Sequence, residues 1–383
     1  MHFEFGTASR IVFEPGSISR VPEIVKGFGT KVLVVTGRDT GRAAGLLASL
    51  EASGVRTAVF SVPGEPTLEM VRRGAQQARD GFPAVIGFGG GSAMDAAKAI
   101  GVLATNSGEP LDYLEVIGRG RSFENAPLMV IAIPTTAGTG AEVTRNAVLG
   151  STEHRVKASL RGPFLLPRVA VIDPDLTLNL PPDVTAYGGL DTLTQLLEAF
   201  VSVKASPFAD LFCLEGLDRV RTSLPVAYRQ PGQREARQEM AFCSLLSGLA
   251  LANAGLGIVH GFAAPLGGML DAPHGAICAA VLPHAVAANV RTLRRLGSGN
   301  EGLERFRKAA RILTGTGDAQ PEDCASFARQ ICGELGVRSL RAWGLGADQI
   351  PVLAEQVEKA NSTKGNPIVL NREEITEIAV SSF

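Results

Sequence analysis

Short apolar runs alternate with helical patterns in the first half of the chain. Up to about Pro174, runs of β-branched and other apolar residues are each closed by Gly, Pro or Asp: KVLVVTG, TAVFSV, AVIGFGGG, LMVIAIPTT and VAVIDPD. Runs that are apolar at nearly every position are typical of parallel strands buried on both faces. Because Gly/Ala-rich helical stretches separate the runs, the pattern predicts a parallel βαβ sheet. The opening segment SRIVFEPGSI predicts a hairpin arm or an edge strand outside that sheet.

The pattern changes after the segment DPDLTLNLPPDV, which is rich in Pro and Asp and is typical of a connector between domains. Beyond it, apolar residues recur at helical spacing, as in TAYGGLDTLTQLLEAFVS and QEMAFCSLLSGLALANAGLG. The sequence therefore predicts two domains. Residues 1–178 would form an α/β dinucleotide-binding domain with a Rossmann-like parallel sheet, and residues 179–383 an all-helical metal and substrate domain.

Composition narrows the class of protein. With 383 residues, 45% hydrophobic and 20% charged, the chain has the make-up of an ordinary globular protein with a large core. A net charge of -1 gives no electrostatic reason to expect nucleic acid or an anionic membrane as a partner. No apolar run approaches the roughly 20 residues that span a bilayer. The five cysteines are scattered and form no CxxC pair, which predicts a cytoplasmic protein with buried thiols.

A run of glycines lies between the strand pattern AVIGF and the helical pattern SAMDAAKAIGVLA. Gly89, Gly90, Gly91 and Ser92 form this turn. Glycines at a strand-to-helix turn let the backbone approach a pyrophosphate, whose charge then faces free N–H groups at the helix start. We expect Ser92 to cap the helix, with Asp95 near its first turn as in a capping box. A tight turn without a ligand is the alternative, and the surrounding strand and helix favour phosphate binding.

A second polar turn, PTTAGTGAEVT, follows the strand pattern LMVIAI and ends at Thr144. The hydroxyls of Thr135, Thr136 and Thr139 could contact the ribose, phosphate or amide of a cofactor. They could equally cap the next helix, and residue type alone leaves both readings open. We include this turn, through Thr144, among the expected cofactor contacts.

The end of the first sheet strand, VVTGRDT, bears on the choice of nicotinamide cofactor. A carboxylate at this place binds the ribose hydroxyls of NAD and repels a 2′-phosphate. This chain has Gly37 followed by Arg38, which leaves space and a cation for that phosphate. The residues therefore favour NADP over NAD, although the nearby Asp39 complicates the inference.

Candidate metal ligands lie in the second half. Asp191 lies in GGLDTLTQLLEA, and His260 and His274 lie in the apolar, Gly-rich stretch GIVHGFAAPLGGMLDAPHG. A carboxylate and two imidazoles are the ligands that a catalytic zinc or ferrous ion uses while it keeps a position open. Gln195, four residues after Asp191 on the same helix face, is a weaker candidate ligand and could instead orient a substrate or water. Two satisfied core histidines are the alternative.

The blocks GGGSAMDAAK, PTTAGTGAEVT, DPDLT, GGLDTLTQLLEA and VHGFAAPLGG…PHG…LP together resemble the iron-containing (group III) alcohol dehydrogenase family, over nearly the whole chain. The resemblance implies NAD(P)-dependent interconversion of an alcohol with an aldehyde or ketone. It further implies an active site in the cleft between the two domains and a homodimer, often joined through the N-terminal arm. Lys157 matches a lysine that contacts the cofactor in such proteins.

Two positions depart from the pattern of that family. Gln195 stands where a histidine would supply a further ligand, and Ala264 stands where another histidine lies beside the nicotinamide. The four-ligand iron site is therefore incomplete, and the usual imidazole for proton relay is absent. The glycerol dehydrogenase branch works with a carboxylate and two histidines around zinc, so Asp191, His260 and His274 remain a workable set.

Three functions follow from these residues. The first is an alcohol dehydrogenase or aldehyde reductase in which a divalent ion polarises the substrate oxygen during hydride transfer. The second is a metal-independent reductase of an acidic carbonyl substrate, similar to maleylacetate reductases. Its histidines would act as acid and anion-binding groups, with Arg145, Arg155 and Arg161 as available cations. The third is a dehydrogenase that has lost catalysis and binds nucleotide as a scaffold or sensor.

Overall fold

The computed structural model describes residues 3–151, 153–154, 156–297 and 300–383. The chain divides into two compact units. The N-terminal unit is Gly6–Leu178. The C-terminal unit is Asn179–Phe383 together with the start of the chain up to Phe5. Phe3 and Phe5 belong with it because their rings pack against the ring of Phe208, with centroids 5.8 Å and 4.7 Å away.

A six-stranded parallel sheet forms the centre of the N-terminal unit, in the order β1-β8-β5-β4-β2-β3. Its strands are β1 (Arg10–Phe13), β2 (Lys31–Thr36), β3 (Arg56–Ser61), β4 (Ala84–Gly89), β5 (Met129–Pro134) and β8 (Val169–Ile172). All five apolar runs predicted to be parallel strands are confirmed as β2, β3, β4, β5 and β8. The α/β fold predicted for this half is therefore confirmed.

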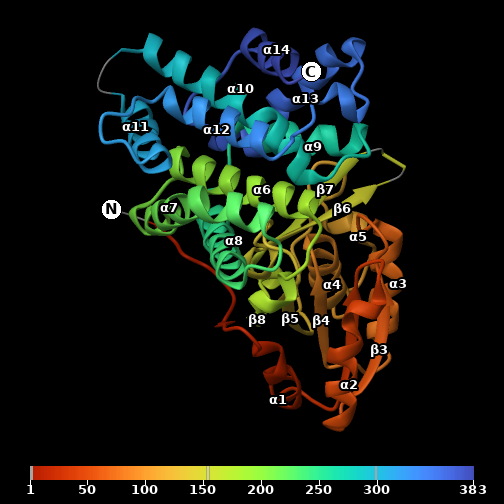
Figure 1. Ribbon diagram of the computed structural model, residues 1–383. Helices are drawn as coiled ribbons and strands as arrows, with labels where there is room; N and C mark the ends of the chain where they lie inside the picture. The colour runs from red at the N-terminus through yellow and green to blue at the C-terminus, as the bar shows by residue number, and fades with distance from the viewer. Residues whose placement is uncertain (1–2, 152, 155, 298–299) are drawn as a thin grey trace. The chain divides into compact units, whose positions relative to one another are not determined.

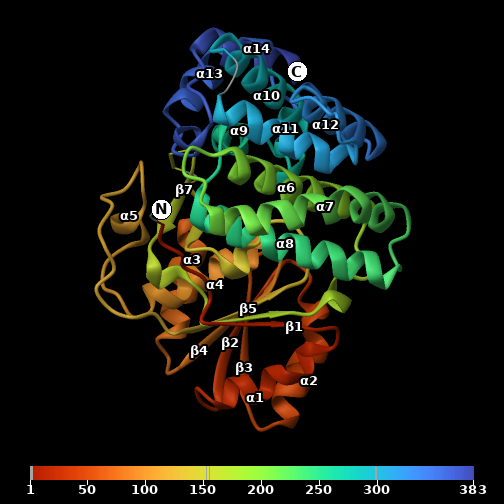
Figure 2. The same cartoon turned by 90° about the vertical axis from the view of Figure 1, so that its left-hand side faces the viewer.

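Strands β2, β4, β5 and β8 are buried on both faces, as their nearly continuous apolar residues require. In β2, Leu33 and Val35 belong to one core cluster and Val32 and Val34 to another, because successive side chains point to opposite faces. The cluster with Leu33 lies under α3 (Leu68–Ala78) and α4 (Gly91–Leu103). The cluster with Val32 lies under α1 (Val21–Lys26) and α2 (Ala44–Ala52). Figure 2 shows these pairs of helices on opposite sides of the strands.

The opening strand differs from its prediction. Arg10–Phe13 pairs in parallel with β8, so it is the edge strand of the main sheet and not an arm outside it. The following turn is fixed by the Asp173 carboxylate, which accepts hydrogen bonds from the backbone N–H groups of Gly16 (2.9 Å) and Ile18 (3.1 Å). This contact spans more than 150 residues of chain, so local alternation of apolar residues could not reveal it.

A two-stranded antiparallel hairpin was also not predicted. It consists of β6 (Asn146–Ser151) and β7 (Val156–Arg161). Its buried residues Ala147, Leu149 and Leu160 extend the cluster that also contains α3 and α4. The hairpin therefore adds to one core of the N-terminal unit without joining the sheet.

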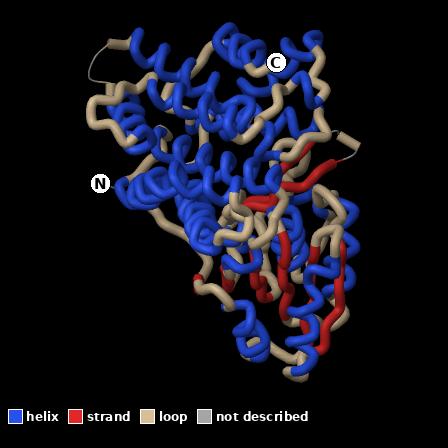
Figure 3. Tube along the Cα trace, in the orientation of Figure 1, coloured by secondary structure: helices blue, strands red, loops and turns tan. Residues whose placement is uncertain are grey.

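The C-terminal unit is helical, as predicted, and every strand that the structure describes precedes Asn179 (Figures 1 and 3). Its α-helices are α6 (Pro182–Val201), α7 (Pro207–Arg229), α8 (Arg234–Ala254), α9 (Ile258–Met269), α10 (His274–Arg295), α11 (Glu301–Thr314), α12 (Asp323–Glu334), α13 (Ile350–Lys359) and α14 (Arg372–Ser381). Helix α6 packs against α7, α8 and α10, and α10 also packs against α9 and α12. Helices α6, α9 and α10 therefore meet in the interior of this unit.

Helix α10 is long and apolar enough by length and composition to cross a membrane, with 78% of its most apolar window buried inside the protein. Helices α8 and α9 pass the same test only as a pair, with a bend of 99° at the break between them. An apolar helix that is buried on most of its surface is what the centre of a helical unit requires. We therefore assign α10 to the core.

Candidate metal centre and dinucleotide site

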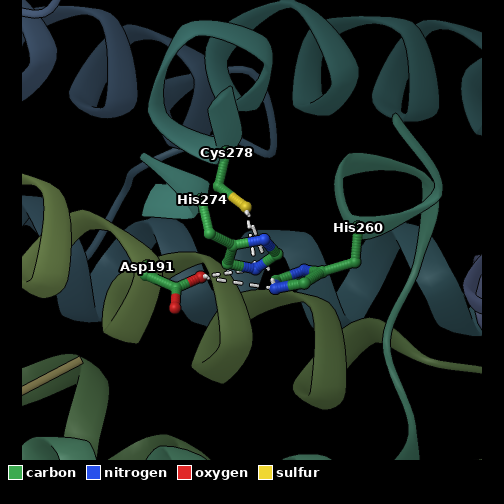
Figure 4. A group of neighbouring side chains, drawn as sticks. All are labelled: Asp191, His260, His274 and Cys278. Carbon is green, nitrogen blue, oxygen red and sulfur yellow. Dashed lines mark hydrogen bonds and ion pairs between the residues drawn. The ribbon is translucent and has the colours of Figure 1, made fainter. Parts of the chain in front are cut away.

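Four side chains from three helices converge in the C-terminal unit. Asp191 comes from α6, His260 from α9, and His274 and Cys278 from α10, and each offers a ligand atom within 4.8 Å of the other three (Figure 4). The Asp191 Oδ1 atom lies 3.3 Å from His260 Nε2 and 3.6 Å from His274 Nε2. The Cys278 Sγ atom lies 3.9 Å and 3.7 Å from the same two nitrogens. This arrangement can hold a cation.

Helical spacing explains why these residues share one place. His274 is the first residue of α10, and Cys278 follows one turn later on the same face. Asp191 lies in the middle of α6, where the start of α10 comes very close. A Cβ atom on Gly275 would lie 2.1 Å from the Tyr187 carbonyl oxygen, so only glycine permits this approach. The glycine after His274 therefore brings that imidazole to the Asp191 carboxylate.

A buried carboxylate orients His260. Glu198 Oε2 lies 2.7 Å from His260 Nδ1, and Glu198 also accepts hydrogen bonds from the backbone N–H groups of Val259 (2.6 Å) and His260 (3.4 Å). With Nδ1–H donating to Glu198, the Nε2 lone pair faces the cluster. Carboxylate–histidine pairs of this kind fix the tautomer and ring direction of metal-ligating histidines.

Gln195 supports Asp191 instead of facing the cluster. Its amide Nε2 donates to Asp191 Oδ2 over 3.0 Å, and its Oε1 accepts from the Ser247 hydroxyl over 2.8 Å. The oxygen that would ligate a metal is thus turned toward Ser247. Because Gln195 occupies Asp191 Oδ2, the other carboxylate oxygen, Oδ1, is the one directed into the cluster.

The cluster fits a divalent ion. Asp191 Oδ1 is buried, its residue is 2% exposed, and it accepts no hydrogen bond. Burial alone would raise the pKa of Asp191, but the adjacent His274 and His260 hold it below its usual value. Burial would likewise lower the pKa of both imidazoles, yet Cys278 and Asp191 raise it. An environment that stabilises two positive charges suits a dication held by neutral imidazoles.

Access to the cluster is uneven. Cys278 is fully buried and His260 is 7% exposed, whereas the His274 side chain is 39% exposed. A small molecule that reaches the cluster within this unit therefore arrives beside His274. Ala264 is exposed one helical turn beyond His260 and brings no titratable group.

Sequence reasoning missed two members of this site. Cys278 follows His274 at a spacing of four, and Glu198 follows Gln195 at a spacing of three, so both share a helix face with a candidate residue. The spacing was visible in PHGAIC and TQLLE. Spacing alone gave no reason to choose Cys278 and Glu198, because a lone buried cysteine or glutamate has many structural roles.

The N-terminal unit brings the glycine turns together at the carboxyl ends of neighbouring strands. Strands β3 and β4 lie on opposite sides of β2, so the order in which strands are added to the sheet reverses between β2 and β4, which is where open α/β sheets bind ligands. Gly37 follows β2 and Gly89 ends β4. A Cβ atom on Gly89 would lie 3.6 Å from the Gly37 backbone nitrogen. These turns therefore flank the expected dinucleotide position.

The first turn of α4 has the free backbone N–H groups that an anion site requires. Gly90 is its N-cap and provides no side chain, so no capping hydrogen bond covers the first N–H groups. The prediction that Ser92 caps this helix is wrong, because α4 begins at Gly91 and Ser92 lies inside its first turn. A Cβ atom on Gly91 would lie 3.0 Å from the Thr139 side chain, and one on Gly90 would lie 3.3 Å from the Thr136 hydroxyl.

Asp95 and Thr144 have internal partners. Asp95 pairs with Lys98 (2.8 Å) and accepts from the Val148 backbone N–H (2.9 Å). Lys98 is fully buried and also donates to the Thr144 hydroxyl (3.1 Å) and the Ala141 carbonyl oxygen (3.0 Å). The capping box expected for Asp95 is therefore absent. Through Lys98, the side chains of Asp95 and Thr144 hold the second turn in place. Thr135 joins that turn to β4, because its backbone N–H donates to the Gly89 carbonyl oxygen (2.9 Å).

Arg38 and Asp39, which follow β2, are exposed and hydrogen-bonded to the backbone. Arg38 is exposed, and its Nε donates to the Pro63 carbonyl oxygen (3.0 Å). The Asp39 carboxylate accepts from the Gly41 N–H (3.0 Å) and so caps the short helix Thr40–Ala43. Lys157 lies on β7, with its Nζ 3.3 Å from Glu65 Oε1.

Glu142 in the second turn makes the N-terminal unit sensitive to pH. Its residue is 2% exposed, and burial raises its pKa from 4.5 to about 7, although Lys98 opposes the shift. The folded state therefore binds more protons than the unfolded state between these values, so the free energy of unfolding falls as pH rises through them.

We expect Glu142→Gln to remove this loss, because the amide stays neutral at every pH. At pH 8 the variant should exceed the wild type in free energy of unfolding by up to roughly 3 kcal/mol, and near pH 4.5 the two should be similar. Urea unfolding followed by circular dichroism at both pH values measures this. A difference that does not change with pH would contradict the assignment.

Comparison with known proteins identifies the family of this chain. The family model described as iron-containing alcohol dehydrogenase matches residues 8–174, and its C-terminal counterpart matches residues 185–383. The chain belongs to the iron-containing alcohol dehydrogenase family. Members of this family are NAD(P)-dependent oxidoreductases that use iron or another divalent metal. The protein is accordingly an alcohol dehydrogenase that interconverts an alcohol with an aldehyde or ketone.

Individual relatives match nearly the whole chain. Alcohol dehydrogenase 4 of Saccharomyces cerevisiae (strain YJM789) is 32% identical over 97% of this chain and 96% of its own length. The 1,3-propanediol dehydrogenase of Citrobacter freundii has the same identity and the same coverage. Among solved structures, a 1,3-propanediol oxidoreductase matches with a TM-score of 0.92 at 32% identity, covering all of both chains. The family is thus shown by sequence and fold together.

Proposed function

We propose that this alcohol dehydrogenase works through a divalent ion held by Asp191, His260 and His274. The observation that carries the proposal is the buried Asp191 Oδ1, which accepts no hydrogen bond and lies within 3.6 Å of both imidazole Nε2 atoms. The ion would act as a Lewis acid on the substrate oxygen during hydride transfer.

The protein groups around the ligands have separate tasks in this proposal. Glu198 keeps the His260 Nε2 lone pair directed inward, and Gln195 keeps Asp191 from rotating. His274, the exposed ligand, borders the path of the substrate. Because Ala264 carries no titratable group, the proton that accompanies reduction must come from water or from a ribose hydroxyl of the cofactor.

Metal removal tests this function. We expect purified enzyme to contain about one equivalent of zinc or iron, and a chelator to abolish turnover with an aldehyde panel. Adding back zinc or ferrous iron should restore the rate. Elemental analysis and steady-state rates measure both effects. A metal-free preparation that turns over at the full rate would contradict the proposal.

The alternative of a metal-independent reductase of an acidic substrate has less support. It requires cations for the substrate carboxylates. Arg161 is already paired with Glu115 over 3.0 Å, and Arg155 lies outside the described residues. It also leaves the buried Asp191 Oδ1 without a partner. A protein without catalysis would have no need for so complete a cluster, and turnover of any aldehyde would dismiss that reading.

We further propose that NADP is preferred to NAD. Gly37 has no side chain, Arg38 is exposed, and the Asp39 carboxylate is committed to Gly41. An exposed guanidinium beside an open position suits a 2′-phosphate. The phosphate-binding groups would be the turn Gly89–Ser92 and the hydroxyls of Thr136 and Thr139. Comparison of kcat/KM for the two cofactors tests this preference.

We propose a cytoplasmic location. All five cysteines are free and buried, which suits a reducing cytoplasm. We propose a homodimer by analogy with the family, and analytical ultracentrifugation would measure it. A monomer at micromolar concentration would contradict that part alone.

A further inference from the structure

We infer that Cys278 is a fourth protein ligand of the metal ion. The set would be Asp191, His260, His274 and Cys278, which favours zinc over ferrous iron. This inference rests on the metal centre proposed above. It adds Cys278 as a sulfur ligand and predicts that the site selects zinc.

The distances fit a tetrahedral site. With bonds of about 2.0–2.1 Å to nitrogen or oxygen and about 2.3 Å to sulfur, tetrahedral zinc separates its N and O ligands by about 3.3 Å and its N and S ligands by about 3.6 Å. The Asp191 oxygen lies 3.3 Å and 3.6 Å from the two Nε2 atoms. The Cys278 sulfur lies 3.9 Å and 3.7 Å from them. Each of these four separations is within a few tenths of an ångström of the ideal value, and all four ligand atoms lie within 4.8 Å of one another, so they can surround one ion.

The surroundings of Cys278 differ from those of other buried cysteines in the chain. At three of these, the thiol faces a backbone carbonyl oxygen: Gly216 for Cys243, Phe306 for Cys324 and Ala279 for Cys332. A thiol that donates to a carbonyl is an inert core group. The Cys278 sulfur faces two imidazole nitrogens instead, and its residue is fully buried. Its partners are thus metal-ligating atoms.

Cys278 also replaces what Gln195 does not provide. Both Gln195 amide atoms are used, one on Asp191 and one on Ser247, so α6 contributes a single ligand. Cys278 on α10 supplies the missing contact from another direction (Figure 4). A thiolate is a soft ligand that selects zinc, whereas carboxylate and imidazole alone suit iron equally well. Catalytic zinc can expand to five ligands, which leaves a position for the substrate oxygen.

Cobalt substitution tests the sulfur ligand directly. Chelator-stripped enzyme reloaded with Co²⁺ should show a near-ultraviolet sulfur-to-cobalt charge-transfer band. The band should be lost in Cys278→Ser and kept in Cys243→Ser, a matched change at a buried cysteine that faces a carbonyl. We also expect Cys278→Ser to weaken zinc by more than the roughly 10–100-fold that loss of an outer partner costs. Its zinc-to-iron affinity ratio should fall at least about ten-fold.

Each result has one meaning. Wild-type enzyme that binds one Co²⁺ without the charge-transfer band would overturn the Cys278 inference and leave the proposed Asp191–His260–His274 centre standing. Wild-type enzyme that binds no Co²⁺ would overturn both. X-ray absorption of the zinc-loaded wild type, which needs no variant, should count one sulfur at about 2.3 Å. A sulfur count of zero would overturn the inference even if Cys278→Ser failed to fold.

Discussion

Replacing Asp191 by alanine should abolish turnover and metal binding together while the dinucleotide still binds. Asp191 Oδ1 is the atom that lies against both imidazoles, and without it the site loses the charge that neutralises a dication. Lewis-acid stabilisation of the reacting oxygen supplies several kcal/mol, so kcat/KM should fall at least about 1,000-fold. Steady-state kinetics, elemental analysis and cofactor titration by fluorescence measure the three properties. His274→Ala should give the same pattern.

Two further variants make this result interpretable. Asp191→Asn keeps the shape and the contact with Gln195 but removes the charge, so it should also lose the metal. His284→Ala changes an imidazole on the same helix, α10, outside the cluster, and should retain the rate and the metal. If Asp191→Asn lacked metal and yet turned over near the wild-type rate, the metal-independent mechanism would replace the one proposed.

A carboxylate at position 37 should change the choice of cofactor. Gly37→Asp should lower kcat/KM with NADP roughly 100-fold and leave the value with NAD unchanged or higher. No atom lies within 4 Å of a Cβ added at Gly37, and its backbone is not in a conformation that disfavours side chains, so the carboxylate can be accommodated. Placing like charges together costs several kcal/mol, and about 2.7 kcal/mol corresponds to 100-fold.

Gly317→Asp is the matched control for this change. Gly317 lies in an exposed loop of the other unit, with equally open space, so the variant carries the same charge and should keep the wild-type preference. Kinetics with both cofactors at the same ionic strength provide the comparison. A Gly37→Asp enzyme that still preferred NADP would show that the 2′-phosphate lies elsewhere. A wild type that preferred NAD would refute the preference itself.

The fold was largely readable from the sequence because its signals are local. A strand buried on both faces must be apolar at nearly every position, and β2, β4 and β5 are. What could not be read was pairing. β1 pairs with β8, a strand that is distant in sequence, and β6 and β7 carry mixed polar residues that resemble a loop.

The candidate site could be predicted only where residue type carries chemistry by itself. Asp191, His260 and His274 were chosen as ligand types, and the structure brings them together. Cys278 and Glu198 were not chosen because their importance depends on which residues α6, α9 and α10 place beside them. The capping box expected with Asp95 is wrong for a related reason, since its partner Lys98 reads in the sequence as an ordinary helix lysine.

Glu198 has a consequence for how this site can vary. The same carboxylate receives the His260 ring and the first backbone N–H groups of α9, so ring direction and helix placement cannot be altered separately. Any change of ligand chemistry on that side would tilt a whole helix. Positions 195 and 278 anchor no helix end, so new metal preferences can arise there by single substitutions without disturbing the scaffold.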